Sequence, residues 1–122
     1  MRILVVDDEP AIRHLIDRYL TRQGHNVFVA PSAGEANALV LDSWQPFDAA
    51  VLDIRLPGID GVACGELLRG LFPGIRVIFI SGSTHSPTHP LADAPLLVKP
   101  FNMTDLVTKL DPQQSDSAPI NR

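Results

Sequence analysis

The feature that most constrains the fold is a repeated switch between short apolar runs and longer amphipathic segments. The apolar runs occupy residues 3–6, 27–30, 49–52, 77–80 and 96–98. Each run has the length of a strand and is too short for a helix, whereas the segments between most of them have helical periodicity. Strands that alternate with helices predict an α/β fold, with a parallel sheet covered by helices on both faces.

Four helices are expected, and the helical periodicity is clearest in the first, third and last of them. Pro10 and Gly24 bracket the first helix, and Ser32 is a suitable N-cap for the second, which ends near residue 41. A third helix is expected from about residue 60, and a last short one ends before Pro112. The apolar faces predicted for the first, third and last helices are Ile12, Leu15, Ile16, Tyr19 and Leu20, then Cys64, Leu67, Leu68 and Leu71, then Met103, Leu106, Val107 and Leu110.

Two segments depart from the alternation. Residues 83–95 contain three prolines, which predict a loop with one helical turn at most. Residues 112–122 form a polar tail that we expect to be disordered. One domain over residues 1–111 is therefore expected.

Composition excludes several classes of protein. The net charge of -4 argues against a nucleic-acid surface. No apolar run approaches the roughly 20 residues that span a membrane. The single cysteine, Cys64, cannot form an internal disulfide and indicates a reducing compartment. A cytoplasmic location is expected.

Polar side chains follow four of the predicted strands. Asp7 and Asp8 follow the first, Asp53 the third, Ser81 the fourth and Lys99 the fifth. Taken singly, each is more simply explained as a cap, a turn residue or a solvated side chain. In a parallel sheet, however, the carboxyl ends of the strands meet at one edge, where ligands bind. Together the five residues predict a shared site.

The chemistry of this set points to phosphoryl transfer. Three neighbouring carboxylates repel one another unless a cation lies among them. An open set of oxygen ligands suits Mg²⁺, which keeps several of its waters. A carboxylate beside Mg²⁺ and a lysine can act as a nucleophile towards phosphorus, while a hydroxyl donates to a phosphoryl oxygen. The residues alone therefore predict an aspartyl-phosphate site.

Four motifs, in order, resemble the signatures of response-regulator receiver domains, the chemotaxis-regulator-like modules of two-component signalling. They are ILVVDDEP at residues 3–10, VLDIRLPGIDG at 51–61, IFISG at 78–82 and LVKPF at 97–101. The resemblance implies a flavodoxin-like, doubly wound, five-stranded parallel sheet of strand order 2-1-3-4-5. Segment 83–95 is shorter than the corresponding segment of the family. This implies that the helix between the fourth and fifth strands, helix 4 of the family, is short or replaced by a loop.

The resemblance also implies a role for each site residue. Asp53 matches the phosphoacceptor, and Asp8 matches the direct Mg²⁺ ligand. Asp7 would hold a metal-bound water or the lysine, and Arg55 would supply a backbone carbonyl to the metal.

Beyond the metal, Ser81 matches the switch hydroxyl and Lys99 the lysine that contacts the phosphate. Pro100 matches a proline whose preceding peptide bond is commonly cis. The implied donor is a phosphohistidine on a sensor histidine kinase or a histidine phosphotransfer protein. The chain is expected to be a monomer, to catalyse only its own phosphorylation and dephosphorylation, and to signal through an unidentified protein target.

The sequence departs from the family in the region through which family members transmit the signal after phosphorylation. The family usually carries Tyr or Phe three residues before the lysine, whereas this chain has Leu96. We therefore expect phosphorylation to act by ordering residues 83–95. The alternative is that the segment is merely a degenerate loop and that the domain serves as a phosphate sink or shuttle.

Three other interpretations remain open. A haloacid-dehalogenase-type phosphatase would need an Asp where Arg55 stands. A flavodoxin-like cofactor binder is disfavoured because Asp7 and Asp8 would repel a flavin phosphate. A pseudo-receiver would fold in the same way and act as an interaction module without phosphorylation.

Overall fold

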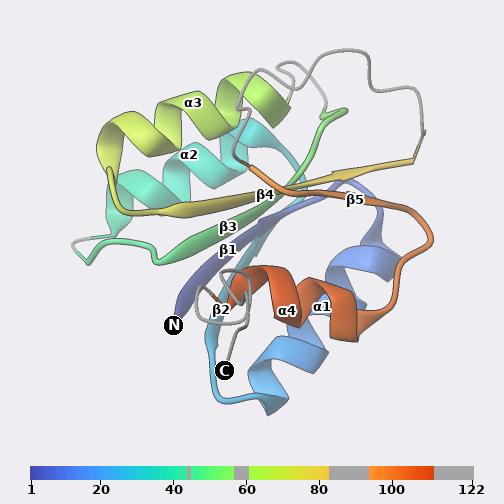
Figure 1. Cartoon of the computed structure of the whole chain (residues 1–122). Helices are drawn as coiled ribbons and strands as arrows, with labels where there is room; N and C mark the ends of the chain where they lie inside the picture. The colour runs from blue at the N-terminus through green and yellow to red at the C-terminus, as the bar shows by residue number, and fades with distance from the viewer. Residues whose placement is uncertain (44, 57–60, 83–93, 112–122) are drawn as a thin grey trace, which may run out of the picture.

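A five-stranded parallel sheet forms the centre of the molecule. The computed structural model describes residues 1–43, 45–56, 61–82 and 94–111, and its sheet has the order β2-β1-β3-β4-β5, as predicted (Figure 1). The strands are β1 (Arg2–Val6), β2 (Asn26–Ala30), β3 (Ala49–Asp53), β4 (Arg76–Ser81) and β5 (Leu96–Val98). The predicted α/β fold class and strand order are therefore confirmed.

Helices cover both faces of the sheet in the described part of the chain. Figure 1 shows α2 (Ala33–Asp42) and α3 (Gly61–Leu71) on one face, with α1 (Pro10–Arg22) and α4 (Met103–Leu110) on the other. Local capping explains several helix ends. Ser32 Oγ accepts a hydrogen bond from the Glu35 N–H at 3.2 Å, as expected for an N-cap. Gly24 has φ of 94°, the left-handed conformation that follows many helices.

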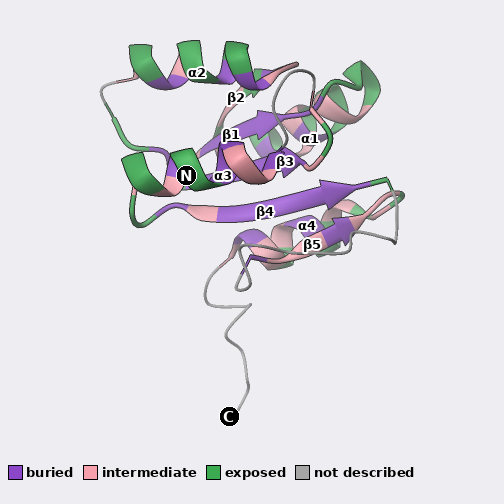
Figure 2. Ribbon diagram, turned by 90° about the horizontal axis from the view of Figure 1, so that it is seen from above, coloured by how far each residue is buried: buried purple, intermediate pink, exposed green. Residues whose placement is uncertain are grey.

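Among the described residues, the core consists of two apolar clusters, one on each face of the sheet. Successive strand residues point to opposite faces, so Leu4 and Val6 join the cluster under α2 and α3, while Ile3 and Val5 join the one under α1 and α4. Figure 2 shows this burial in the central strands, with the outer helix surfaces exposed. Every residue of β3 is buried, which explains why its sequence is a continuous run without alternation.

The predicted apolar faces of two helices were too wide. Leu15 in α1 is 51% exposed, and Leu67 and Leu71 in α3 are 52% and 57% exposed. A helix that packs on a sheet in one layer buries only the stripe facing the strands. In α3 that stripe contains Cys64 and Leu68, which are both buried.

Some predictions fall on residues that the structure does not describe. These include most of the proline-rich segment 83–95, for which only residues 94 and 95 are described, and the tail 112–122. The expected loop, its ordering by phosphorylation and the expected disorder of the tail remain predictions. Within the described ranges, no helix combines the length and the apolar character that membrane crossing requires.

Candidate functional site

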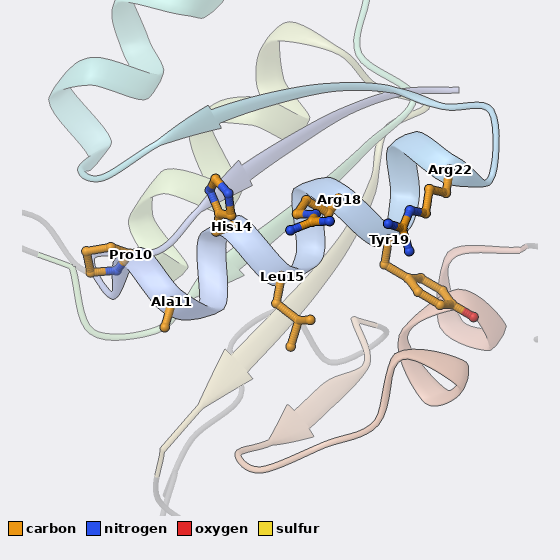
Figure 3. A pocket seen from close by; sticks show the side chains of 7 residues that line it. All are labelled: Pro10, Ala11, His14, Leu15, Arg18, Tyr19 and Arg22. Carbon is orange, nitrogen blue, oxygen red and sulfur yellow. The ribbon is translucent and has the colours of Figure 1, made fainter.

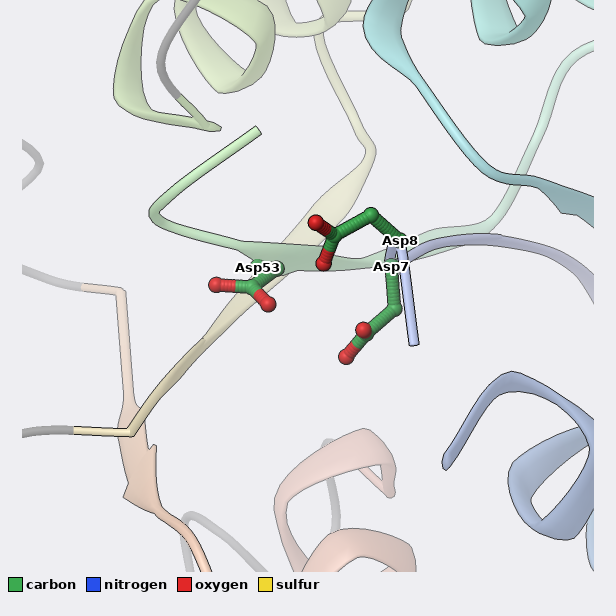
Figure 4. Close-up of side chains that lie close together, drawn as sticks. All are labelled: Asp7, Asp8 and Asp53. Carbon is green, nitrogen blue, oxygen red and sulfur yellow. The ribbon is translucent and has the colours of Figure 1, made fainter. Parts of the chain in front are cut away.

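Three carboxylates meet at the carboxyl edge of the sheet. Asp7 and Asp8 follow β1, and Asp53 is the last residue of the adjacent β3, where Val6 pairs with Leu52. One oxygen from each of the three acids lies within 4.8 Å of the others (Figure 4). Asp7 and Asp53 are buried, whereas Asp8 is exposed. The predicted acidic cluster therefore forms, and one side of it is open to solvent.

Asp7 is held in place mainly by its neighbours along the chain. Its Oδ1 accepts a hydrogen bond from the Glu9 N–H at 2.8 Å, and its backbone carbonyl accepts one from Arg13 Nη1 at 2.9 Å. Burial raises the pKa of Asp7, and the charge of Asp53 raises it further. The Glu9 N–H and Lys99 oppose that rise in pKa. The acid thus lies in surroundings that disfavour its charge.

Asp53 is oriented from both sides of its carboxylate. Its Oδ1 accepts a hydrogen bond from the Arg55 N–H at 3.0 Å, while its Oδ2 accepts one from Lys99 Nζ at 3.2 Å. The Arg55 backbone thus lies against Asp53, although Arg55 as a whole residue is exposed. Beneath Asp53, the Gly61 N–H donates to the Ile54 carbonyl at 2.7 Å, which joins the first turn of α3 to the end of β3.

Lys99 brings a cation into the acidic cluster. It follows β5, and its N–H donates to the Ser81 carbonyl at 2.7 Å, which fixes it beside the end of β4. Lys99 Nζ lies 3.2 Å from Asp7 Oδ2, 3.2 Å from Asp53 Oδ2 and 2.5 Å from Glu9 Oε1. Burial alone would lower the pKa of Lys99, but these three carboxylates together raise it. Lys99 is therefore firmly protonated.

The other residues predicted for the site lie at the ends of β4 and β5, the strands that follow β3 in the sheet. Ser81 is buried at the end of β4, one residue beyond Ile80, the pairing partner of Asp53. The Lys99–Pro100 peptide bond is cis. Leu96, at the position that is usually aromatic, is partly buried and packs against the core cluster under α2 and α3.

Sequence reasoning assigned no role to Glu9, although its carboxylate makes the shortest contact to Lys99. Glu9 occupies the N-cap position of α1 without forming a side-chain cap hydrogen bond. An acid at an N-cap directly after two site acids is the signal that could have drawn attention to it.

The donor set fits a hard divalent cation. The candidate ligand atoms on side chains are carboxylate oxygens of Asp7, Asp8 and Asp53, and the open side at Asp8 leaves room for waters. Asp7 Oδ2 is buried and has no hydrogen bond of good geometry, although it lies near the Lys99 ammonium. A cation among these oxygens would satisfy that atom and reduce the repulsion between the acids.

A hollow with a volume of about 570 Å³ runs along α1, and Asp7, Asp8 and Asp53 do not line it (Figure 3). Its lining combines apolar and basic side chains, namely Pro10, Ala11, His14, Leu15, Arg18, Tyr19 and Arg22.

Relatives of known sequence match most of the chain. The transcriptional regulatory protein AruR of Pseudomonas aeruginosa is 35% identical over 116 residues, which cover 88% of this chain and 47% of AruR. TcrA of Mycobacterium tuberculosis is 37% identical over 115 residues, covering 90% of this chain and 44% of TcrA. The chain therefore spans about half the length of these two relatives. In contrast, it covers 93% of the response regulator receiver protein CpdR of Brucella abortus, at 27% identity.

Solved structures show the same fold. A CheY-like receiver domain protein from Methanospirillum hungatei matches with a TM-score of 0.81 and 31% identity, over 93% of each chain. The response regulator TrrA of Thermotoga maritima, solved in complex with Mg²⁺ and BeF, matches with a TM-score of 0.75 and 31% identity. That match covers 90% of this chain and 98% of TrrA. The family model of the response regulator receiver domain matches residues 3–111 of the sequence. The chain therefore belongs to this family.

Proposed function

We propose that this chain accepts a phosphoryl group on Asp53 in a Mg²⁺-dependent reaction and passes the signal on through protein contacts. The observation that carries the proposal is the meeting of Asp7, Asp8, Asp53 and the Lys99 ammonium at one edge of the sheet. Membership of the receiver family and the Mg²⁺–BeF complex of TrrA support it.

The chemistry assigned to Asp53 is nucleophilic. A carboxylate oxygen of Asp53 forms a bond to the phosphorus of a phosphohistidine, while the phosphorus–nitrogen bond breaks and its electron pair stays on the imidazole. The Arg55 N–H holds the other oxygen of Asp53 and so presents the attacking one. Lys99 and the Ser81 hydroxyl stabilise the charge on the phosphoryl oxygens.

Carboxylate oxygens of Asp8 and Asp53 and the backbone carbonyl of Arg55 would hold Mg²⁺ in this proposal. Asp7 would hold a metal-bound water or Lys99. When bound, the ion would offset the negative charge that develops during phosphoryl transfer.

The implied partners and setting follow from the receiver family. The donor is a sensor histidine kinase or a histidine phosphotransfer protein, and the recipient of the signal is another protein. The chain catalyses only its own phosphorylation and dephosphorylation, and we place it as a monomer in the cytoplasm.

The test combines a small phosphodonor with one substitution. The wild-type chain and Asp53→Asn are incubated with acetyl phosphate, with Mg²⁺ or with EDTA, and intact masses are measured. We expect one added phosphoryl group on the wild type with Mg²⁺ only, and none on Asp53→Asn. An unmodified wild type would refute the proposal and favour the pseudo-receiver, and an equal adduct on Asp53→Asn would assign the acceptor to another residue.

A further inference from the structure

Glu9 is the acid at this site that the proposed chemistry leaves without a role. Its Oε1 lies 2.5 Å from Lys99 Nζ, closer than either Asp7 Oδ2 or Asp53 Oδ2, both at 3.2 Å. Glu9 also gives up the usual alternative for an acid at its position, because its side chain forms no cap hydrogen bond with α1. Its carboxylate is therefore directed to the lysine.

The Lys99 ammonium has three N–H donors, and three carboxylates surround it. A phosphoryl group on Asp53 would bring further acceptor oxygens and negative charge to the same ammonium. The phosphoryl oxygens take over the contact that Asp53 Oδ2 makes with Lys99, and because there are more of them they also compete with Glu9 and Asp7 for the remaining donors.

Exposure identifies the partner that can leave most easily. The Glu9 side chain is 57% exposed, compared with 0% for Asp7 and 8% for Asp53. Water can therefore solvate the Glu9 carboxylate once it separates, whereas Asp7 would be left as a buried charge without its partner. The geometry thus favours release of Glu9.

From this we infer that Glu9 is a positioning residue that holds Lys99 in the unphosphorylated state and is displaced from it by the phosphoryl group. The inference rests on the proposed function. It predicts that Glu9 competes with phosphorylation, so that neutralising Glu9 should favour the phosphorylated form.

The test is a titration with beryllofluoride, a mimic of the phosphoryl group, at saturating Mg²⁺ and followed by amide NMR. Glu9→Gln is compared with the wild type and with Glu66→Gln, which removes an exposed acid from α3 on the opposite face of the sheet. We expect Glu9→Gln to bind beryllofluoride about two- to fivefold more tightly, the range of an exposed ion pair. Glu66→Gln should bind as the wild type does.

A second pair of variants tests whether Glu9 acts through Lys99. In a Lys99→Met background, Glu9→Gln should leave the affinity for beryllofluoride unchanged. A gain that persists there would mean direct repulsion of the anion and would overturn the positioning role. Equal binding by the wild type and Glu9→Gln, or an equal gain in Glu66→Gln, would also overturn it. Failure of the wild type to bind beryllofluoride at all would instead refute the proposed function.

Discussion

Gly61 lies directly against the backbone of Asp53, and replacing it with alanine should destabilise the domain. A Cβ at this position would lie 2.0 Å from the Asp53 carbonyl oxygen, 2.8 Å from the Asp53 carbonyl carbon and 2.9 Å from the Ile54 Cα. All three are backbone atoms, so no side chain can rotate away. The shortest contact must open by roughly 1.4 Å to become an ordinary van der Waals contact.

The magnitude follows from the kind of atom that must move. Overpacking a core usually costs about 1–3 kcal/mol, and more where the backbone is displaced. For Gly61→Ala we expect a loss of about 3 kcal/mol in the free energy of unfolding. That is a large part of the roughly 5–15 kcal/mol that stabilises a typical domain.

Gly70 in the same helix is the matched control. A Cβ there would meet no heavy atom within 4 Å, and Gly70 does not have positive φ. Gly70→Ala should therefore stabilise the protein by about 0.5 kcal/mol, because alanine loses less backbone freedom on folding.

Urea unfolding followed by circular dichroism measures both variants. We expect the midpoint to fall for Gly61→Ala and to rise slightly for Gly70→Ala, with similar dependence on urea. A Gly61→Ala variant as stable as the wild type would refute the argument from close approach. It would mean that the start of α3 can shift away from β3 at little cost.

Four further outcomes follow from the site and its surroundings. Mg²⁺ should stabilise the wild type in urea unfolding by about 2.7 kcal/mol at one hundred times its Kd, and Asp8→Ala should lose most of that gain; an equal gain in both would exclude Asp8 as a ligand. Without Mg²⁺, Asp7→Asn should unfold at higher urea than the wild type at pH 7, since burial raises the pKa of Asp7. Because the folded state holds the Asp7 proton more tightly than the unfolded one, this advantage should shrink as the pH falls through the raised pKa towards 3.8, and a growing advantage would contradict the sign. Cys64 is buried, and burial raises the pKa of its thiol, so a thiol reagent should label it only as fast as the protein opens; rapid labelling of the native protein would show otherwise. Asn102→Ala should lower the free energy of unfolding by about 1 kcal/mol, because Asn102 Oδ1 accepts the Asp105 N–H at 2.8 Å; an unchanged urea midpoint would show that water replaces this cap.

The order of elements could be predicted because each strand carries its own local signal. The five apolar runs match the five strands to within a residue or two, and Ser32 and Gly24 mark helix ends by capping chemistry that acts over a few residues. The width of a buried helix face was not predictable in this way. Leu15 and Leu67 have the spacing of core residues, yet their burial depends on how much of each helix the sheet covers.

The candidate site was largely predictable for a topological reason. Parallel strands bring their carboxyl ends together whatever the details of packing, so Asp7, Asp8, Asp53 and Lys99 had to meet once the strand order held. The contact between Glu9 and Lys99 joins side chains 90 residues apart and depends on their rotamers. The place of Glu9 directly after two site acids marks it as a candidate, but the local sequence does not specify which side chain it contacts.

The two apolar clusters, one on each face of the sheet, have a consequence for the evolution of the domain. Neither includes the acids or the lysine at the sheet edge, so one substitution there could abolish the proposed phosphorylation and leave the fold intact. One reversal would restore it only while the other site residues are kept, and nothing in the apolar clusters requires them to be kept. Once several of them have changed, suitable groups would have to return together at the ends of several strands.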